Sequence, residues 1–215
     1  MTGAGVTLNV TADQSGKPLS RITWDGLLRN AIAYLVEKGH EDTAARWIQR
    51  TYDALDDPEG GGLLDVAYIM SGRMKQHGQF SKWLELVFGS LGQESCSYRR
   101  AEGVAQSGAT LLTTNYDDVL EKHCGLRCVG RSNKYDLTNF MGGDADRVLH
   151  IHGSYQDGDD VMLDTIPYYD ARTSDRVQDI LKMLLQTKTI LFVGCRGVND
   201  PNFDALMRWV KRHDP

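Results

Sequence analysis

Apolar residues in the first half of the chain recur at the spacing of amphipathic helices. From Thr23 to Gly39 an apolar stripe returns every three or four residues, with Thr23 placed to cap the helix and Gly39 to end it. A second helix is predicted over about 42–55. The sequence Asp-Asp-Pro-Glu-Gly-Gly-Gly at 56–62 interrupts this pattern, and helical spacing resumes after it. We therefore expect residues 42–107 to be entirely helical.

The second half of the chain has a different pattern, in which short apolar runs alternate with helical stretches. The predicted strands are residues 109–113, 147–152, 161–163 and 189–193. An amphipathic helix is predicted over 174–187, and it leads directly into the last of these runs. This alternation predicts an α/β fold around a parallel sheet. The Gly-, Ser- and Thr-rich residues 1–21 are predicted to form loops.

Ligands of parallel sheets bind beyond the carboxyl ends of the strands, so the residues found there are the first candidates for chemistry. These residues are Thr114, Asn115 and Asp117 after the first run, His152 after the second, and Gly194 and Cys195 after the last. Asn115 and Asp117 are equally suited to cap a helix or to form a turn. His152 is either a packed core residue or a catalyst. Position alone leaves both interpretations open.

The Gly3-Ala4-Gly5 turn near the N-terminus is a second candidate. Glycines allow backbone N–H groups to approach a diphosphate closely. The third glycine of the dinucleotide-binding motif is absent, since Leu8 stands in its place. An ordinary Gly-rich N-terminus is therefore the alternative interpretation.

Composition and charge exclude several classes of function. Lys and Arg number 24 against 29 Asp and Glu, and the net charge of −5 argues against a nucleic-acid partner. No apolar run approaches the ~20 residues that span a bilayer, and the first residues do not resemble a secretory signal. Four cysteines spread over 215 residues do not form a disulfide scaffold, so we expect an intracellular, cytoplasmic protein.

Two polar clusters are candidates for a metal site. Cys124 and Cys128 lie beside His123, but a zinc site of this type needs a second pair of ligands at similar spacing, and the sequence has none. They are interpreted as ordinary thiols near a helix end, and no zinc or other metal is expected. The three aspartates of 157–160 are likewise predicted to lie in a solvated loop.

Five short motifs, taken together and in order, resemble the sirtuin superfamily. They are Gly-Ala-Gly-Val-Thr at 3–7, Gly-Lys-Pro-Leu-Ser-Arg at 16–21, Thr-Thr-Asn-Tyr-Asp at 113–117, His-Ile-His-Gly-Ser at 150–154 and Phe-Val-Gly-Cys-Arg-Gly-Val-Asn-Asp-Pro-Asn-Phe at 192–203. The chain is more similar to the divergent silent-information-regulator-two-like branch, which includes NAD-hydrolysing immune domains. The resemblance therefore also implies an immune effector domain.

This resemblance implies a Rossmann-like three-layer parallel sheet that binds NAD. The helices of about 42–107 would then be an insertion within a single domain, 1–215. The family also has a strand directly before the Gly-Ala-Gly turn and another after the helix that here ends near Arg212. The resemblance therefore implies a fragment that lacks the first and last strands. The four-cysteine zinc ribbon of sirtuin deacylases is not found either.

The resemblance also assigns residues to the cofactor. Those implied to bind it are Gly3, Ala4, Gly5 and Thr7 at the pyrophosphate, Pro18 and Arg21 in the following loop, Gly194 near the adenosine half, and also Thr114 and Cys195. Leu19-Ser20 differs from the Asp-Phe pair that the family has at this place. Contacts between this loop and the cofactor are therefore the least specific part of the assignment.

Asn115, Asp117 and His152 are the implied catalytic residues. Asn115 would orient the ribose and the attacking water, and Asp117 would hold the nicotinamide carboxamide. His152 would act as general base or as hydrogen-bond partner of the ribose hydroxyls. The expected function is an NAD glycohydrolase that releases nicotinamide and ADP-ribose.

Three alternatives to this function stay open. The first is a non-catalytic module that senses NAD or ADP-ribose within a larger multidomain protein. The second is an NAD-dependent protein deacylase, and the third is an inactive copy of the fold. Self-association and attached domains are compatible with each of them.

Overall fold

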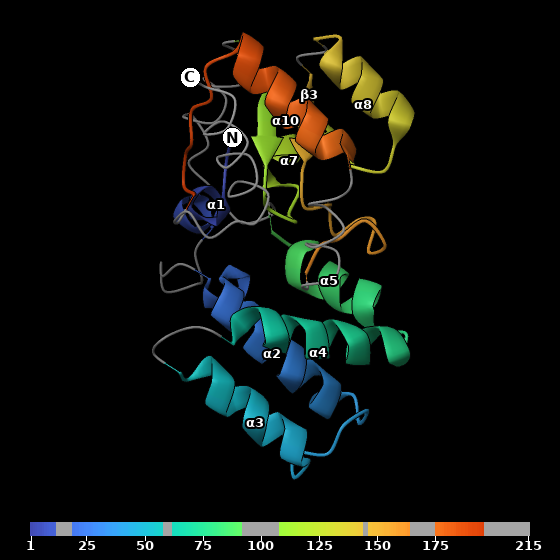
Figure 1. Ribbon diagram of the computed structural model, residues 1–215. Helices are drawn as coiled ribbons and strands as arrows, with labels where there is room; N and C mark the ends of the chain where they lie inside the picture. The colour runs from blue at the N-terminus through green and yellow to red at the C-terminus, as the bar shows by residue number, and fades with distance from the viewer. Residues whose placement is uncertain (12–18, 58–61, 92–107, 144–145, 164–174, 196–215) are drawn as a thin grey trace, which may run out of the picture.

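The helices of the first half and the strands of the second half form two parts of the molecule, one beneath the other in Figure 1. The computed structural model describes residues 1–11, 19–57, 62–91, 108–143, 146–163 and 175–195. We call the described residues of 19–91 the helical part, and those of 1–11 and 108–195 the sheet part. None of the described helices is long and apolar enough to cross a membrane.

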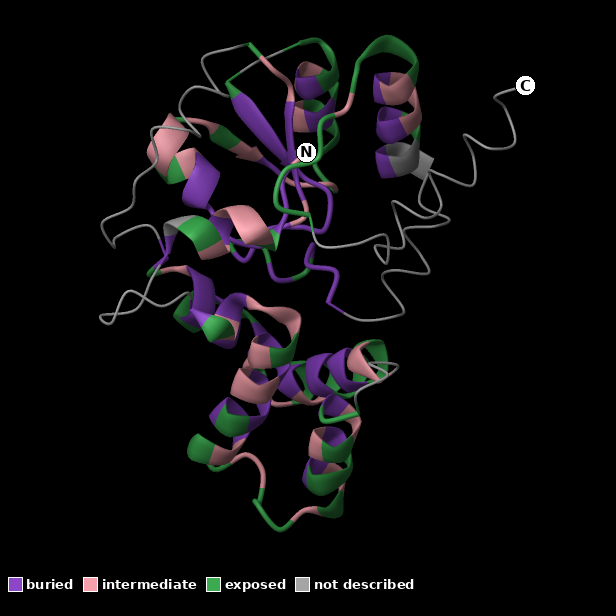
Figure 2. Ribbon diagram, turned by 90° about the vertical axis from the view of Figure 1, so that its left-hand side faces the viewer, coloured by how far each residue is buried: buried purple, intermediate pink, exposed green. Residues whose placement is uncertain are grey.

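The helical part contains a short 3-10 turn and four α-helices. They are η1 (Ser20–Ile22), α2 (Trp24–Glu37), α3 (Arg46–Leu55), α4 (Leu63–Gln76) and α5 (Phe80–Phe88). The predicted cap is confirmed, since the Thr23 hydroxyl accepts a hydrogen bond from the Gly26 N–H at 3.1 Å. Leu28 and Leu35 of α2 are completely buried, as are Met70 and Trp83 of the helices packed around it. Figure 2 shows these buried inner faces. Within the described residues, 42–91 is helical as predicted, apart from its turns.

The sheet part is built on three short parallel strands. They are β1 (Leu111–Thr113), β2 (Arg127–Val129) and β3 (Arg147–His150), in the order β1-β3-β2. The helices are α7 (Val119–Cys124), α8 (Lys134–Met141) and α10 (Asp175–Thr187). Helix α7 packs on the face of the sheet that carries Leu111 and Val148, whereas α8 and α10 pack on the face that carries Leu112 and Leu149. The predicted α/β fold with a parallel sheet is confirmed.

The first three residues extend the sheet beyond β1. Thr2 forms parallel bridges with Thr113 on one side and with Val193 on the other. The Thr2 N–H donates to the Leu112 carbonyl at 2.8 Å, and the Gly3 N–H donates to the Val193 carbonyl at 3.1 Å. Helix α1 (Ala4–Val10) follows directly, so the prediction that residues 1–21 form only loops is wrong at this point.

Two of the predicted strands are not formed. Residues 161–163 are buried but irregular, because the Met162 N–H donates to the His152 carbonyl at 2.8 Å rather than to a strand. The run 189–193 was expected to be a buried strand, but only Val193 forms a bridge, and Leu191 is 72% exposed. Among the described residues this run has a strand-like neighbour on one side only, where Val193 pairs with Thr2.

The two parts of the molecule meet at the carboxyl ends of β1 and β3. The Phe88 ring at the end of α5 lies 5.9 Å from the Tyr116 ring and 6.3 Å from the Tyr155 ring, measured between centroids. Tyr116 follows β1 and donates its hydroxyl to the Met162 carbonyl at 2.6 Å. The loops that were predicted to carry chemistry therefore lie against the helical part.

Candidate functional site

The ends of β1 and β3 bring two predicted catalytic residues to the same edge of the sheet. Thr113 pairs with His150 in the parallel register, and the Ile151 N–H donates to the Thr113 carbonyl at 3.0 Å. Asn115 and His152 each lie two residues beyond this pair, and both are buried. The strands therefore hold both residues at neighbouring positions on the carboxyl edge.

His152 is followed by a turn that only glycine accommodates easily. Gly153 has a φ of +83°, and a Cβ placed there would lie 2.2 Å from the Asp160 carbonyl oxygen. The chain therefore turns back directly after His152, and the segment containing Met162 packs against its main chain. This turn fixes where the histidine lies relative to the strand ends.

Thr7, Asn115 and Asp117 form a buried chain of hydrogen bonds. The Asn115 side-chain amide donates from Nδ2 to Thr7 Oγ1 at 2.9 Å, and Thr7 Oγ1 donates to Asp117 Oδ2 at 2.9 Å. Thr7 belongs to α1, whereas the other two follow β1, so this chain joins the N-terminal motif to the strand end. Because an ionised carboxylate only accepts, Asp117 fixes the direction of both hydrogen bonds.

Asp117 combines a structural contact with a perturbed charge. Its Oδ1 accepts a hydrogen bond from the Val119 N–H at 3.2 Å, at the beginning of α7, so it also forms the turn that its residue type predicts. Burial raises the pKa of Asp117 to about 6, although the hydrogen bonds from Thr7 and Val119 act in the opposite direction. Asp117 therefore takes up a proton more readily than an ordinary carboxyl group, and its ionised form is the one that fixes the direction of the hydrogen-bond chain.

The predicted phosphate turn contacts the last predicted loop directly. The Gly5 N–H donates to the Gly194 carbonyl at 2.9 Å, and a Cβ at Gly5 would lie 2.7 Å from that oxygen. Gly194 has a φ of +66°, and a Cβ there would lie 2.6 Å from the Val6 nitrogen. Both glycines are therefore needed for the close approach of these two backbones.

The other residues that were predicted to bind the cofactor lie in several places. Ala4 is exposed, the Thr114 N–H donates to the Thr2 carbonyl at 3.1 Å, and Cys195 is exposed next to Gly194. Arg21 lies in η1, and its Nε is buried without a hydrogen-bond partner among the described residues. Pro18 lies outside the described residues.

A second buried carboxylate, Asp118, was not predicted as a site residue. Its Oδ2 accepts from the Tyr155 hydroxyl at 2.8 Å and from Gln156 Nε2 at 3.1 Å, and Lys122 pairs with its Oδ1 at 2.9 Å. Burial, followed by the hydrogen bond to Asp118, raises the pKa of Tyr155 to about 12. This network holds the loop after His152 against the beginning of α7.

The loop of 157–160 differs from its prediction. Asp160 is buried rather than solvated, because Arg131 reaches it from the segment after β2. The Arg131 N–H donates to Asp160 Oδ2 at 2.8 Å, and its Nε lies 3.2 Å from Oδ1. This pair could not be predicted from the sequence, because the two residues are 29 positions apart.

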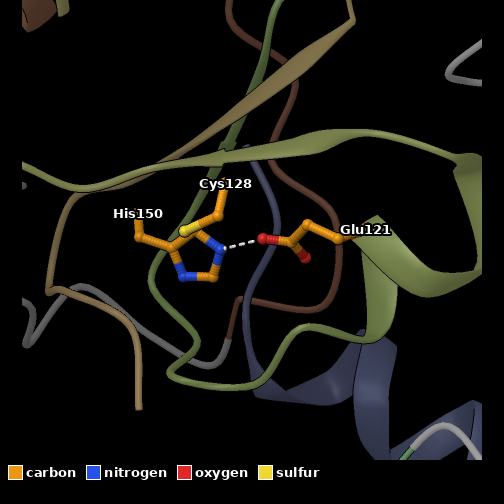
Figure 3. A group of neighbouring side chains, drawn as sticks. All are labelled: Glu121, Cys128 and His150. Atoms are coloured by element: carbon orange, nitrogen blue, oxygen red, sulfur yellow. Dashed lines mark hydrogen bonds and ion pairs between the residues drawn. The ribbon is translucent and has the colours of Figure 1, made fainter. Parts of the chain in front are cut away.

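Figure 3 shows a further cluster that sequence reasoning missed, made of Glu121, Cys128 and His150. His150 is completely buried, with Nδ1 2.9 Å from the Asn115 carbonyl oxygen and Nε2 2.5 Å from Glu121 Oε1. Burial acts to lower the pKa of His150, but Cys128 and Glu121 together raise it well above its ordinary value. Since both acceptors are oxygens, the ring is protonated on both nitrogens in this arrangement.

Comparison with known families identifies the second half of the chain. Residues 109–215 match the model of the SIR2-like domain. The chain carries a divergent SIR2-like domain. The matched residues include Asn115, Asp117, His152 and Gly194, whereas Gly3 to Thr7 lie before them. In the structure the SIR2-like domain and the N-terminal motif are nevertheless joined, through Thr7 and through Gly5.

A relative of the SIR2-like domain is found among characterised proteins. Defense-associated sirtuin 2 of Bacillus subtilis is 29% identical over 119 residues. The match covers 51% of this chain and 11% of that protein. The chain thus corresponds to a small share of the relative's length, and the comparison supports the sirtuin-like assignment of the domain itself.

Proposed function

We propose that this chain binds NAD and cleaves it to nicotinamide and ADP-ribose. The observation that carries the proposal is the buried chain of hydrogen bonds from Asn115 through Thr7 to Asp117. It connects a Gly-rich turn to the carboxyl edge of a parallel sheet, where α/β proteins bind their ligands. The likeness to a sirtuin-like relative supports NAD as the nucleotide.

The residues around this edge fit a dinucleotide in two respects. Arg21 carries a buried Nε with no hydrogen-bond partner among the described residues, and a phosphate oxygen would satisfy it. Gly3 and Gly5 lack side chains next to Gly194, so the start of α1 and the loop of Gly194 are brought together. We assign the pyrophosphate to Gly3, Ala4, Gly5, Thr7 and Arg21, with Pro18 and Thr114 beside it. Gly194 and Cys195 are assigned to the adenosine half.

Cleavage of the nicotinamide–ribose bond builds positive charge on the ribose, as in glycoside hydrolysis. With its Nδ2 committed to Thr7, Asn115 presents Oδ1 as an acceptor, which suits it to orient a ribose hydroxyl or a water. His152, at the neighbouring strand end, would accept the proton of that water or hydroxyl. Asp117 would keep Thr7 and Asn115 aligned and hold the nicotinamide carboxamide.

Three further features belong to the same proposal. We infer that the sheet is part of a Rossmann-like three-layer arrangement, since α7 packs on one face and α8 and α10 on the other. We infer that the helices of about 42–107 are an insertion in a single sirtuin-like domain. The name of the Bacillus subtilis relative supports a role in defence, with the chain acting as the NAD-cleaving effector.

The test is to incubate the purified chain with NAD and to measure the release of nicotinamide. We expect Asn115→Ala and His152→Ala each to lower the rate by about 100-fold or more, because positioned acid–base groups contribute that much. Asn139→Ala, on α8 away from this edge, is the matched control and should retain the rate. Circular dichroism would verify that each variant keeps its helices.

The outcome also separates the alternatives. Nucleotide binding without nicotinamide release would replace the glycohydrolase by a sensing module. Nicotinamide release that requires an acylated peptide would indicate a deacylase. Unchanged NAD consumption by the Asn115→Ala, His152→Ala double variant would refute the assignment of both residues.

A further inference from the structure

The buried cluster of Glu121, Cys128 and His150 is built from three separate elements. Glu121 lies on α7, Cys128 on β2 and His150 on β3. One ligand atom from each, a carboxylate oxygen, a sulfur and a ring nitrogen, lies within 4.8 Å of the other two. The His150 side chain is fully buried and that of Glu121 is 10% exposed. The proposed NAD chemistry assigns no role to these three side chains.

The orientation of the His150 ring is that of a metal ligand. Its Nδ1 lies 2.9 Å from the Asn115 carbonyl oxygen, which can only accept, so Nδ1 carries a hydrogen and donates. Nε2 is therefore the nitrogen that faces Glu121, and Cys128 lies beside the same ring, as Figure 3 shows. Histidines that ligate a metal through one nitrogen regularly donate the other N–H to a carbonyl in this way.

Glu121 provides a second, independent observation. One carboxylate oxygen, Oε1, contacts His150, while Oε2 is buried and has no hydrogen-bond partner among the described residues. A buried carboxylate oxygen without a donor is uncommon and costly. A cation bound to the Glu121 carboxylate would neutralise the charge that its two oxygens share.

We propose that Glu121, Cys128 and His150 bind one zinc ion through a carboxylate oxygen, Sγ and Nε2. A thiolate, an imidazole and a carboxylate form a donor set that zinc accepts in tetrahedral geometry, with the fourth position held by water. Tetrahedral bonds of ~2.0–2.2 Å would set the nitrogen and oxygen ~3.3 Å apart. The present distance of 2.5 Å would therefore open by less than 1 Å, which a rotation of the Glu121 side chain provides. Binding releases the Nε2 and Sγ protons to solvent.

The site would have a structural consequence for the proposed catalytic edge. Zinc would tie α7 to β2 and β3, and His150 already holds the Asn115 main chain through Nδ1. The metal would thus position the loop of Asn115 without touching the nucleotide. The spacing of Cys124 and Cys128 did not predict this site, because only Cys128 belongs to it and the other two ligands come from positions 121 and 150.

The experiment measures zinc binding by the full chain. After treatment with a chelator, the chain is titrated with Zn²⁺, and with Co²⁺ to detect the charge-transfer absorption of a cysteine–cobalt bond. We expect one ion per chain and a rise in melting temperature on adding zinc. Cys128→Ser and Glu121→Gln should weaken binding by more than the ~10- to 100-fold that loss of a supporting hydrogen bond costs a metal site.

Cys124→Ser is the matched control, because Cys124 is also a partly buried cysteine, four residues away, but lies outside the cluster. It should retain the stoichiometry, the affinity and the cobalt–thiolate absorption. Absence of zinc binding by the wild-type chain would overturn the proposal. Equal loss in Cys124→Ser and Cys128→Ser would also overturn it, since it would indicate nonspecific thiol binding. Both measurements are independent of NAD cleavage, so this site can fail while the proposed function holds, or the reverse.

Discussion

The helical part and the sheet part bury very different groups. Among the described residues, fourteen polar or charged residues are buried, and only Thr51 and Ser71 of these lie in the helical part. The other twelve lie in the sheet part, and Thr7, Asn115 and Asp117 are among them. The helical part therefore has the core of an ordinary helical bundle, whereas the sheet part holds its polar groups in networks.

This difference separates apolar stabilisation from the organisation of polar groups. Apolar packing in the helical part stabilises the fold without selecting particular hydrogen bonds. Buried polar groups are costly unless each has a partner, so the networks of the sheet part fix its side chains in particular orientations. Pre-organised side chains are what a catalytic edge requires.

The largest effect is expected from removing a large core side chain of the helical part. Trp83→Ala deletes a fully buried ring and its hydrogen bond to Asn30, and should lower the free energy of unfolding by about 3–5 kcal/mol. Leu86→Ala is the control on the same helix, since Leu86 is 61% exposed, and should change it by less than about 0.5 kcal/mol. Urea unfolding would measure both. Similar losses in the two variants would contradict the described packing of α5.

The second-largest effect is expected from the buried carboxyl group of Asp117 in the sheet part. Because the pKa of Asp117 is raised from 3.8 to about 6, the folded chain binds this proton more tightly than the unfolded chain. Its contribution to stability is fully present below about pH 4 and is lost as the pH rises through 6. The difference corresponds to about 3 kcal/mol at 1.36 kcal/mol per pH unit.

Asp117→Asn separates this contribution from that of other carboxyl groups. Relative to the wild type, the variant should become more stable as the pH rises from 4 to 7, as measured by the free energy of unfolding. In the wild type, nicotinamide release should fall as the pH decreases below about 6. A pH-independent difference in stability would show that Asp117 does not titrate in this range.

Replacing one buried threonine by valine in each part compares the two parts directly. Thr7→Val leaves Asn115 Nδ2 and Asp117 Oδ2 each without a partner, which should cost about 1–3 kcal/mol and lower NAD cleavage by about 10- to 100-fold. Thr51→Val removes a buried hydroxyl that donates to the Trp47 carbonyl at 2.7 Å, at a cost of about 0.5–1.5 kcal/mol and with the rate retained. Equal effects on the rate would remove the distinction between the two parts.

The smallest effect is expected at a helix end. Thr23→Ala removes the hydroxyl that accepts the Gly26 N–H and should destabilise the chain by about 1 kcal/mol. Thr43→Ala, at an exposed position before α3, should cost less. Thermal unfolding of the two variants would reveal whether the cap of α2 matters as described.

Sequence patterns predicted the helical part better than the sheet part, for a physical reason. Helix α2 follows from a stripe of residues that lie one turn apart, so burial and periodicity carry the same information. Strand β2 (Arg127–Val129) has no apolar run of its own and was missed; it forms because the edge of β3 offers hydrogen bonds. The run 189–193 is the reverse case: it is apolar and was predicted as a strand, but it pairs only at Val193.

The candidate site shows the same division. The strand-end rule predicted that Asn115, Asp117 and His152 follow strands, and the structure places them after β1 and β3, because this position depends on the local sequence of each strand and turn. It could not find Glu121 and His150 as neighbours, since they are 29 positions apart and meet only through the sheet. Gly5 was expected to approach a diphosphate, and in the structure the Gly194 backbone makes that close approach.

The pairing of Thr2 has a consequence for how the chain folds. Its partners Leu112 and Val193 lie far along the sequence, and the Met1 ammonium donates to the Leu191 carbonyl across 190 positions. Contacts of such long range form late, because a large loop must close first. Most of the buried residues in the core of the helical part lie within 19–91, although Phe88 also packs against Tyr116 and Tyr155. Residues 1–3 are therefore among the last of the described residues to reach their native neighbours.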